Sequence, residues 1–496
     1  MKLSIPTKVA QIALLFTILV VSMVSIGHSS QSSNIKLSAT GSISYWPSVD
    51  IVINISKVIG VNNLSLGFQC DWERWHHLID RPIMQNLASE ANFKLVRIFD
   101  FRKTSQWGFP DLMPCRDWAT QTWDWTQVDA LTQTIFSVGA EPLYCLGYPR
   151  ENIQNYIPKN MPVNSTTLLP YLKDYAAYTS EWVKHFKVKG WPVRFYEIGN
   201  EPDHYFGTSS TKIGYYIDLW NACARAMRAE NPNVLISQDR IVIKMVLDAW
   251  LIKGDNVNFI DLHKYDAGSL GGYTDAQLFN NAENGEGFTT ISGWYSAVDA
   301  QQKWLNARGK KLPMICSESN LNWYTDTGTD PKIQQMTGAV WIALVLKQAV
   351  VKGWNYFSYF EFCSSKSREQ TYGSGGWGFG MVNEDDNKPW YPYFVHKMIG
   401  SNLAVGDKLA ETKSSSNDVR SIAWLHDEKL NILLICKVDE SRTVTIEGVS
   451  GQLNVSWIDT TISYQTPSVQ TSIISSMESL IMEGYTVALL QTLVTS

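Results

Sequence analysis

The sequence predicts an α/β fold, a (β/α)8 barrel followed by a C-terminal β-sandwich. Two observations carry this prediction. From about residue 62 to residue 395, short apolar runs alternate with longer helical patterns, which is typical of parallel strands joined by helical crossovers. After Pro392, strand-like runs are separated by polar turns alone, which is typical of an antiparallel sandwich. The chain has 496 residues, 45% of them hydrophobic, and is therefore long enough for two domains.

Eight apolar runs are the expected barrel strands. Clear helical patterns lie between them at residues 168–187, 215–230 and 333–351. Eight such repeats favour a closed TIM barrel, in which the active site is built at the C-terminal ends of the strands. An open doubly wound sheet is the alternative, but no glycine-rich nucleotide motif follows the first run. The eight runs are LSLGFQC (64–70), FKLVRIF (93–99), EPLYCL (141–146), VRFYEIG (193–199), VLISQ (234–238), NFIDLH (258–263), PMICS (313–317) and WNYFSY (354–359).

Five strand-like runs form the expected sandwich, at residues 420–426, 430–438, 443–449, 452–458 and 486–493. Residues 35–56 are also strand-like and precede the first barrel strand, so we expect them to join the sandwich. The second domain is then discontinuous in sequence. The expected boundaries are a signal peptide at 1–30, N-terminal strands at 31–61, the (β/α)8 barrel at 62–395 and the sandwich at 396–496.

The first residues have the pattern of a secretory signal. Lys2 and Lys8 precede an apolar run from Ile12 to Ile26. This run is shorter than the roughly 20 apolar residues that a spanning helix needs, so we expect a cleaved signal, with a retained N-terminal anchor as the alternative. The protein is therefore expected to be secreted or at the cell surface. Four glycosylation sequons agree with export, at Asn54, Asn63, Asn164 and Asn454.

Composition excludes several classes of function. The formal net charge is -5 and the Lys and Arg residues are scattered, so no basic face is expected to bind nucleic acid. Seven Cys are too few and too dispersed for a disulfide-built scaffold, and no CxxC or His-rich spacing indicates a metal site. We expect no metal and no organic cofactor. The 20 Trp and 22 Tyr offer flat apolar faces that suit sugar rings.

Two glutamates stand where strand ends are expected. In RFYEIGNEPD (194–203), Glu197 lies in the middle of the strand and is expected to be buried, as a partner of Arg97. Glu201 follows the strand end, and Pro202 is expected to hold it in an extended conformation. In LPMICSESN, Glu318 comes one residue after a buried run. Glu201 and Glu318 should therefore face each other across the mouth of the barrel.

This arrangement resembles the retaining glycoside hydrolases of clan A. The sequence Asn200-Glu201-Pro202 at the end of strand four, with Glu318 at the end of strand seven, carries the resemblance. The EIGNEP form and the trailing sandwich are most similar to families 39, 79 and 51, which include xylosidases, glucuronidases and arabinofuranosidases. The resemblance implies that Glu201 is the acid/base and Glu318 the nucleophile. It also implies that Asn200 hydrogen-bonds the sugar 2-hydroxyl.

The resemblance extends to residues around the two glutamates. His263 and Tyr265 share one face of strand six and are implied to contact the acid/base and the nucleophile, although a buried core histidine is the alternative. Arg97 matches an arginine that steadies the nucleophile, and a structural ion pair would explain it equally well.

The aromatic pattern departs from the family at strand eight. SYFEF (358–362) has Phe360 where a Trp is usual, so we expect Trp323, or else Trp354 or Trp377, to form the floor of the sugar site. Further candidates for sugar stacking, each of which packing alone would explain, are residues 71–75, Trp107, Trp123 and Trp125.

The predicted function is hydrolysis of O-glycosyl bonds in a β-linked oligo- or polysaccharide, of the β-xylosidase or β-glucanase kind, by a double displacement between two glutamates. A non-catalytic carbohydrate-binding or cell-surface protein on the same fold is the alternative, because a fold does not dictate a function. A serine esterase or a lyase is disfavoured, since no GxSxG motif is present to supply an activated serine.

Overall fold

A computed structural model describes residues 46–70, 74–99, 112–147, 157–202, 206, 210–238, 244–267, 273–284, 305–322, 332–365, 378–463 and 466–493. The expected signal peptide, residues 1–30, lies outside the described residues. No helix in the described ranges is both long enough and apolar enough to cross a membrane.

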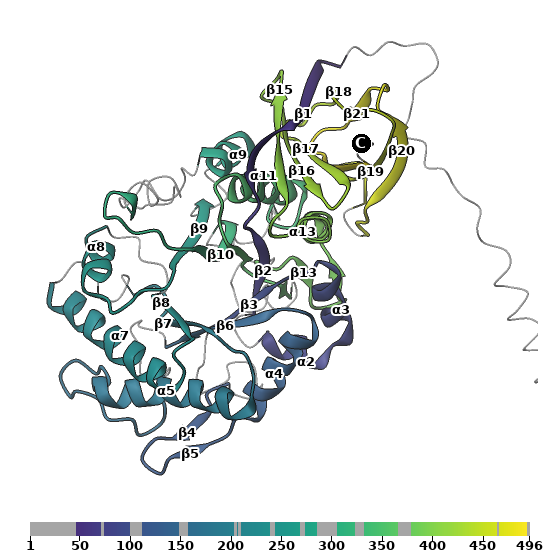
Figure 1. Cartoon of the computed structure of the whole chain (residues 1–496). Coiled ribbons are helices and arrows are strands. Elements are labelled where there is room, and N and C mark those ends of the chain that lie inside the picture. The colour runs from purple at the N-terminus through teal and green to yellow at the C-terminus, as the bar shows by residue number, and fades with distance from the viewer. Residues whose placement is uncertain are drawn as a thin grey trace, which may run out of the picture. The chain divides into compact units, whose positions relative to one another are not determined.

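Eight parallel strands form a curled sheet, in the order β8-β7-β6-β3-β2-β11-β10-β9 (Figure 1). Where β8 meets β9, the Ser237 hydroxyl donates to the Phe259 carbonyl at 2.5 Å, and the Ile236 N–H donates to the Asn258 side chain at 2.9 Å. These bonds link the two ends of the sheet, so the expected (β/α)8 barrel is confirmed. Its strands are β2 (Ser65–Cys70), β3 (Leu95–Ile98), β6 (Glu141–Leu146), β7 (Phe195–Ile198), β8 (Leu235–Gln238), β9 (Ile260–Ala267), β10 (Met314–Asn322) and β11 (Tyr356–Tyr359).

Helices lie on the outside of the strand ring (Figure 1). Local sequence sets two of their ends: Pro82 begins α3, and α5 ends at Lys189, just before Gly190, which has a left-handed φ of 71°. Helix α11 is apolar on nearly every side because it packs against both the barrel and the C-terminal sheet. The helices are α2 (Trp75–Asp80), α3 (Pro82–Glu90), α4 (Thr126–Ser137), α5 (Leu172–Lys189), α7 (Ser210–Glu230), α8 (Lys244–Lys253), α9 (Asp275–Asn284), α11 (Met336–Val351) and α13 (Tyr391–Gly400).

Short strands form two small sheets in the loops that follow two of the barrel strands. After β3, a small hairpin is formed by β4 (Cys115–Asp117) and β5 (Thr122–Trp123). After β11, a three-stranded sheet is formed by β12 (Cys363–Ser364), β13 (Val382–Asn383) and β14 (Lys388–Pro389).

The second sheet has nine strands in the order β20-β19-β22-β17-β16-β15-β1-β18-β21. Strand β1 (Ser48–Val61) lies inside it, antiparallel to β15 and parallel to β18. Along β1, Val49, Ile51 and Ile53 are buried while the residues between them are exposed. The expectation that the N-terminal strand joins the C-terminal sheet is therefore confirmed. The other strands are β15 (Lys408–Ser414), β16 (Val419–His426), β17 (Lys429–Cys436), β18 (Arg442–Glu447), β19 (Gln452–Ile458), β20 (Gln470–Ser475), β21 (Leu480–Met482) and β22 (Val487–Leu493).

The barrel interior changes from apolar to polar along the strands. A buried apolar cluster fills it near the N-terminal ends and contains Leu95, Leu143, Phe195, Phe259 and Ile315. Because side chains alternate along a strand, the residues two positions further on also face inward. These residues are Arg97, Cys145, Glu197, Asp261 and Ser317, all fully or almost fully buried. The interior thus becomes polar just below the C-terminal strand ends.

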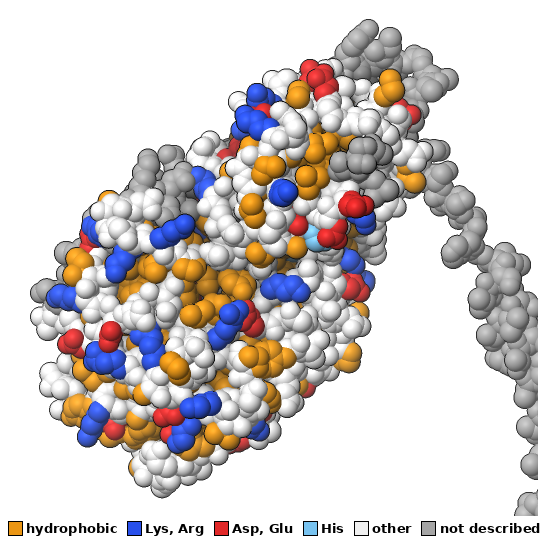
Figure 2. Space-filling view, viewed as in Figure 1, with side chains coloured by type: hydrophobic (Ala, Val, Ile, Leu, Met, Phe, Trp, Pro, Cys, Tyr) orange, Lys and Arg blue, Asp and Glu red, His pale blue; other side chains and the backbone are white. Residues whose placement is uncertain are grey.

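The surface agrees with the scattered charge of the sequence. Figure 2 shows Lys and Arg side chains interspersed with Asp and Glu on the visible face, without a single basic patch. The four sequon asparagines, Asn54, Asn63, Asn164 and Asn454, are all exposed, as an acceptor of a glycan must be. All seven Cys are buried.

Candidate active site

The C-terminal strand ends bring together the predicted polar residues, which come from four different strands. Asn200 and Glu201 follow β7, Glu318 lies on β10, and Arg97 lies on β3. His263 and Tyr265 share the inner face of β9. Trp323, the remaining predicted site residue, lies outside the part of the chain that the structure describes.

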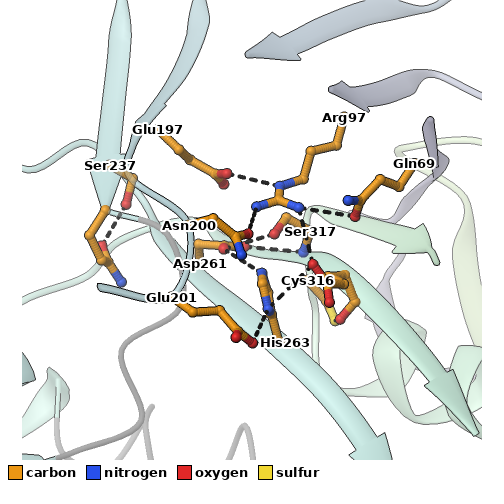
Figure 3. Close-up of polar contacts among 12 residues, drawn as sticks. Gln69, Arg97, Glu197, Asn200, Glu201, Ser237, Asp261, His263, Cys316 and Ser317 are labelled. Carbon is orange, nitrogen blue, oxygen red and sulfur yellow. Dashed lines mark hydrogen bonds and ion pairs between the residues drawn. The ribbon is translucent and has the colours of Figure 1, made fainter. Parts of the chain in front are cut away.

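Arg97 is the centre of the buried polar network (Figure 3). Its Nε donates to Glu197 at 2.9 Å, and its Nη2 donates to the Asn200 side-chain oxygen at 2.8 Å. Its Nη1 donates to Gln69 at 3.0 Å and to Glu318 Oε2 at 3.2 Å. The expected Arg97–Glu197 pair is therefore confirmed. The same guanidinium also contacts Glu318. Arg97 therefore makes both the structural ion pair and the contact with Glu318, which the sequence offered as alternatives.

Glu318 is held through both carboxylate oxygens. The Tyr265 hydroxyl donates to Oε1 at 2.5 Å, and Arg97 donates to Oε2. Both donors are themselves buried. Two fixed donors define the orientation of the carboxylate, and charge-assisted bonds of this kind are stronger than neutral ones. Glu318 is nevertheless 8% exposed, so part of the residue remains accessible from the barrel mouth.

Glu201 has a backbone conformation that the sequence did not predict. Its φ is +47°, in the left-handed region, so the expectation that Pro202 holds it extended is wrong. Gly199 before it also has a positive φ, of 79°. The chain turns here because the Gly199 and Asn200 N–H groups bond to the carbonyls of Leu146 and Gly147, at 2.8 and 3.1 Å. A left-handed non-glycine residue costs about 1–3 kcal/mol and persists only where its surroundings impose it.

His263 lies against both glutamates. Its Nδ1 is 3.1 Å from Glu201 Oε1 and 3.6 Å from Glu318 Oε2. One oxygen of each glutamate lies within 4.8 Å of the other. The alternative of an ordinary core histidine does not describe this position, since the imidazole touches both carboxylates.

The same three side chains are a possible set of metal ligands. Within the described ranges, Glu201, His263 and Glu318 are the one group whose donor atoms lie close enough together. Ligands of tetrahedral zinc at bond lengths of about 2.0–2.2 Å stand roughly 3.3–3.6 Å apart, similar to the two distances from Nδ1. However, Arg97 places a permanent positive charge 3.2 Å from Glu318, which disfavours a divalent cation.

Sequence reasoning missed Asp261. This side chain is 1% exposed and accepts hydrogen bonds from the Ser317 N–H at 3.1 Å and from the Ser317 hydroxyl at 2.8 Å. Its Oδ2 is 3.6 Å from His263 Nε2. A signal was present in the sequence, because Asp261, His263 and Tyr265 stand at alternate positions of one strand and must share a face.

One of the tryptophans expected to form the floor of the sugar site lies elsewhere in the barrel. Trp354 precedes β11, at the opposite end of the barrel from the site, and is buried against Phe357 at a ring distance of 6.1 Å. It therefore cannot form the floor of the sugar site, and the expectation for Trp354 is wrong. Phe360 does lie near the site, with its ring 6.3 Å from that of Tyr265. Trp377 lies outside the described residues.

The tryptophans after β3 are engaged in packing. Trp123 and Trp125 stack on each other at 5.3 Å, and Trp125 stacks on His185 at 4.0 Å. Their partners come from helix α5, on the outside of the barrel. The packing alternative thus accounts for both rings. Of the other candidates for sugar stacking, Trp107 and residues 71–73 lie outside the described residues.

Known structures share this architecture, although no family model and no curated protein matches the sequence. A monomeric β-xylosidase from Caulobacter crescentus CB15 superposes with a TM-score of 0.61 at 15% identity, over 89% of this chain and 99% of the other. A glucosidase from Croceicoccus marinus gives 0.63 at 14% identity, over 90% and 100%. An α-L-arabinofuranosidase from Thermotoga maritima gives 0.62 at 12%, over 90% and 100%. The chain therefore has the TIM barrel and β-sandwich fold of the clan A glycoside hydrolases.

Proposed function

We propose that this protein is a retaining glycoside hydrolase that acts on β-linked glycans. The observation that carries the proposal is the spacing of Glu201 and Glu318, which have carboxylate oxygens within 4.8 Å of each other at the C-terminal strand ends. Retaining enzymes place their two carboxyl groups about 5–5.5 Å apart, whereas inverting enzymes leave about 6.5–9.5 Å for a water molecule. The short spacing supports retention.

The reaction then proceeds in two displacements. Glu318 attacks the anomeric carbon and forms a glycosyl ester, while Glu201 transfers its proton to the leaving oxygen. A water molecule next attacks the same carbon. Glu201 accepts a proton from that water, and the Glu318 carboxylate is released. Each step inverts the anomeric carbon, so the product retains the configuration of the substrate.

The neighbouring residues suit these roles. Arg97 and Tyr265 both donate to Glu318, which stabilises the anion that a nucleophile must be. The side-chain oxygen of Asn200 accepts from Arg97. This bond fixes which way the amide points, so the NH2 group of Asn200 is the part left to donate to the sugar 2-hydroxyl. His263 contacts Glu201 and holds it beside the leaving oxygen.

For the substrate we propose a neutral β-linked glycan of the xylan or glucan type. The resemblance in sequence supports this choice, and the similar structures include a β-xylosidase and a glucosidase. The secretory pattern of residues 1–30 supports action outside the cell or at its surface.

Product stereochemistry tests the proposed function. Aryl β-xylosides and β-glucosides would be hydrolysed while NMR follows the first anomer formed, which is expected to be β. A 2-deoxy-2-fluoro glycosyl fluoride is expected to label Glu318, identified by peptide mass, and Glu318→Gln should not be labelled. An α product, or a label on another residue, would contradict the mechanism. Glycan binding without turnover would support the non-catalytic alternative.

A further inference from the structure

Strand β10 contains one extra residue immediately before Glu318. In its pairing with β9, Cys316 stands opposite Leu262, and Glu318 already stands opposite His263. Ser317 is therefore the additional residue of a β-bulge. Bulges re-aim side chains and often lie beside active sites.

The bulge decides which way Glu318 points. Ile315 belongs to the apolar cluster inside the barrel. Cys316, the next residue, therefore faces outward together with its partner Leu262 on β9. Regular alternation would turn Ser317 inward and Glu318 outward, away from Arg97. With the extra residue, Ser317 and Glu318 both contact interior groups. The position of Glu318 thus depends on the irregularity at Ser317.

Asp261 holds this irregularity in place. One of its oxygens accepts from the Ser317 N–H and the other accepts from the Ser317 hydroxyl. A buried N–H that a bulge removes from the strand ladder needs another acceptor, and Ser317 is fully buried. We propose that Asp261 is a positioning residue, which clamps the Ser317 bulge so that Glu318 enters the barrel. This inference rests on the proposed function, in which Glu318 is the nucleophile.

An alternative role for Asp261 is to orient the His263 imidazole, and this role has to be distinguished from the clamp on the Ser317 bulge. The distance from Asp261 Oδ2 to His263 Nε2 is 3.6 Å, longer than a normal hydrogen bond. The bonds to Ser317 are 2.8 and 3.1 Å. The geometry therefore ties Asp261 to the bulge more closely than to the imidazole.

Two substitutions distinguish these roles. In Asp261→Asn the amide oxygen still accepts from the Ser317 N–H, and the amide NH2 can donate to the Ser317 hydroxyl, so the clamp survives while the charge is lost. Asp261→Ala removes the clamp. We expect Asp261→Asn to keep kcat within about tenfold, and Asp261→Ala to lower kcat about 10²-fold with a nearly unchanged KM, as a displacement of about 1 Å can do. An Asp261→Asn variant as slow as Asp261→Ala would overturn the proposal.

A second experiment combines the Asp261 substitution with Glu318→Ala and measures the azide-dependent rate. Azide replaces the nucleophile there, so the position of residue 318 no longer matters. Adding Asp261→Ala should change the azide-dependent rate by less than about threefold, if positioning of Glu318 accounts for its effect. A full loss in this background would assign Asp261 to Glu201 and His263 instead. Ser237→Ala is the matched control, because it removes another buried interior hydroxyl, from β8, and should leave kcat near that of the wild type.

A crystal structure of the variant separates this proposal from the proposed function. In Asp261→Ala, Glu318 is expected to lie beyond hydrogen-bond distance from Tyr265, and an unmoved Glu318 would overturn the clamp whatever the activity. If Asp261→Ala does not fold, Ser317→Ala removes one of the two bonds and is expected to lower kcat about tenfold. Absence of wild-type turnover and labelling would instead contradict the proposed function.

Discussion

Arg97 and Glu197 form an ion pair inside the barrel, with Arg97 Nε 2.9 Å from Glu197 Oε2 and neither side chain exposed. The same guanidinium reaches Glu318 at 3.2 Å. One arginine therefore links a glutamate of β7 with a glutamate of β10. Glu197 sets the position of Arg97, and Arg97 in turn sets the position of Glu318.

Glu197→Gln should weaken both stability and catalysis. Removing one charge of a buried pair typically costs about 3–5 kcal/mol. Arg97 keeps its contact with Glu318, so we expect a loss toward the lower end of this range, which urea unfolding would measure. The loss of kcat should be similar for good and poor leaving groups, since the affected contact is that of Glu318. The exposed pair of Glu181 and Lys184 is the control, and Glu181→Gln should change the free energy of unfolding by less than about 0.5 kcal/mol. Equal effects of the two substitutions would refute the buried-pair argument.

Glu201 and Glu318, the proposed acid/base and nucleophile, should respond differently to the leaving group. Glu201→Ala is expected to slow substrates with poor leaving groups by about 10²–10⁴-fold and to spare activated aryl glycosides, which depart without protonation. Glu318→Ala should abolish turnover for every leaving group, because no covalent intermediate forms.

Azide products check the same assignment independently. Azide added to Glu201→Ala should give a glycosyl azide of retained configuration, and azide added to Glu318→Ala should give the inverted one. The same anomer from both variants, or leaving-group dependence in Glu197→Gln, would show that the roles are assigned to the wrong residues.

The ion pairs of Glu283 should stabilise the protein at neutral pH, and this contribution should be lost in acid. It accepts hydrogen bonds from Arg420 on β16 and from Lys437, the latter at 2.5 Å, and so ties α9 to the C-terminal sheet. Burial acts to raise the pKa of Glu283, but these two cations outweigh it and hold the pKa below its usual range. A lowered pKa in the folded state gives stability that is fully present above the unfolded pKa of about 4.3 and is lost as pH falls through the folded pKa.

Glu283→Gln would test this pH dependence. The variant should melt at a lower temperature than the wild type at neutral pH, and the difference should shrink as the pH falls below about 4. Glu428→Gln, at an exposed position, is the control and should melt like the wild type throughout. A difference in melting temperature that stays constant from neutral to acid pH would show that the charge of Glu283 is not responsible.

Chelation should leave the activity intact. A double displacement between two glutamates needs no metal, so dialysis against EDTA is expected to leave kcat/KM unchanged. Added Zn2+ should inhibit only weakly and in competition with substrate, because Glu201, His263 and Glu318 offer ligand atoms while Arg97 beside Glu318 opposes a further cation. Activity that disappears on chelation and returns with Zn2+ would point to metal-assisted hydrolysis instead.

The substrate should carry no sulfate groups. Among the basic residues near the strand ends, Arg97 and Lys264 are buried and each is paired with a carboxylate, Lys264 with Asp266 at 2.6 Å. Arg102 and Lys103 lie outside the described residues. Binding of a sulfated chain would need several accessible Arg or Lys contacts. Turnover of xylan or glucan oligosaccharides is therefore expected, and selective cleavage of heparan-type chains would refute this prediction.

The sequence by itself determined the barrel strands, the N-terminal strand, five of the C-terminal strands and the two catalytic candidates, whereas β15, β20 and β21 were not expected. All eight expected strand runs are barrel strands, because burial on both faces requires short continuous apolar runs. Glu201 and Glu318 stand at the ends of such runs, where a polar side chain reaches the mouth of the barrel, and the resemblance carried by Asn200-Glu201-Pro202 singled them out among the carboxylates there. The N-terminal strand could also be placed, because an alternating strand outside the barrel needs a sheet to join.

Tertiary structure alone decided how these residues are oriented. Local preference places a residue before proline in extended backbone, yet bonds to the neighbouring strand turn Glu201 into the left-handed region. Regular alternation would point Glu318 outward, yet the Ser317 bulge, bound by Asp261, brings it inside. In both cases the deciding hydrogen bond joins strands that are distant in sequence. Periodicity within one strand carries no information about such a bond, because its partner is defined only when the barrel closes.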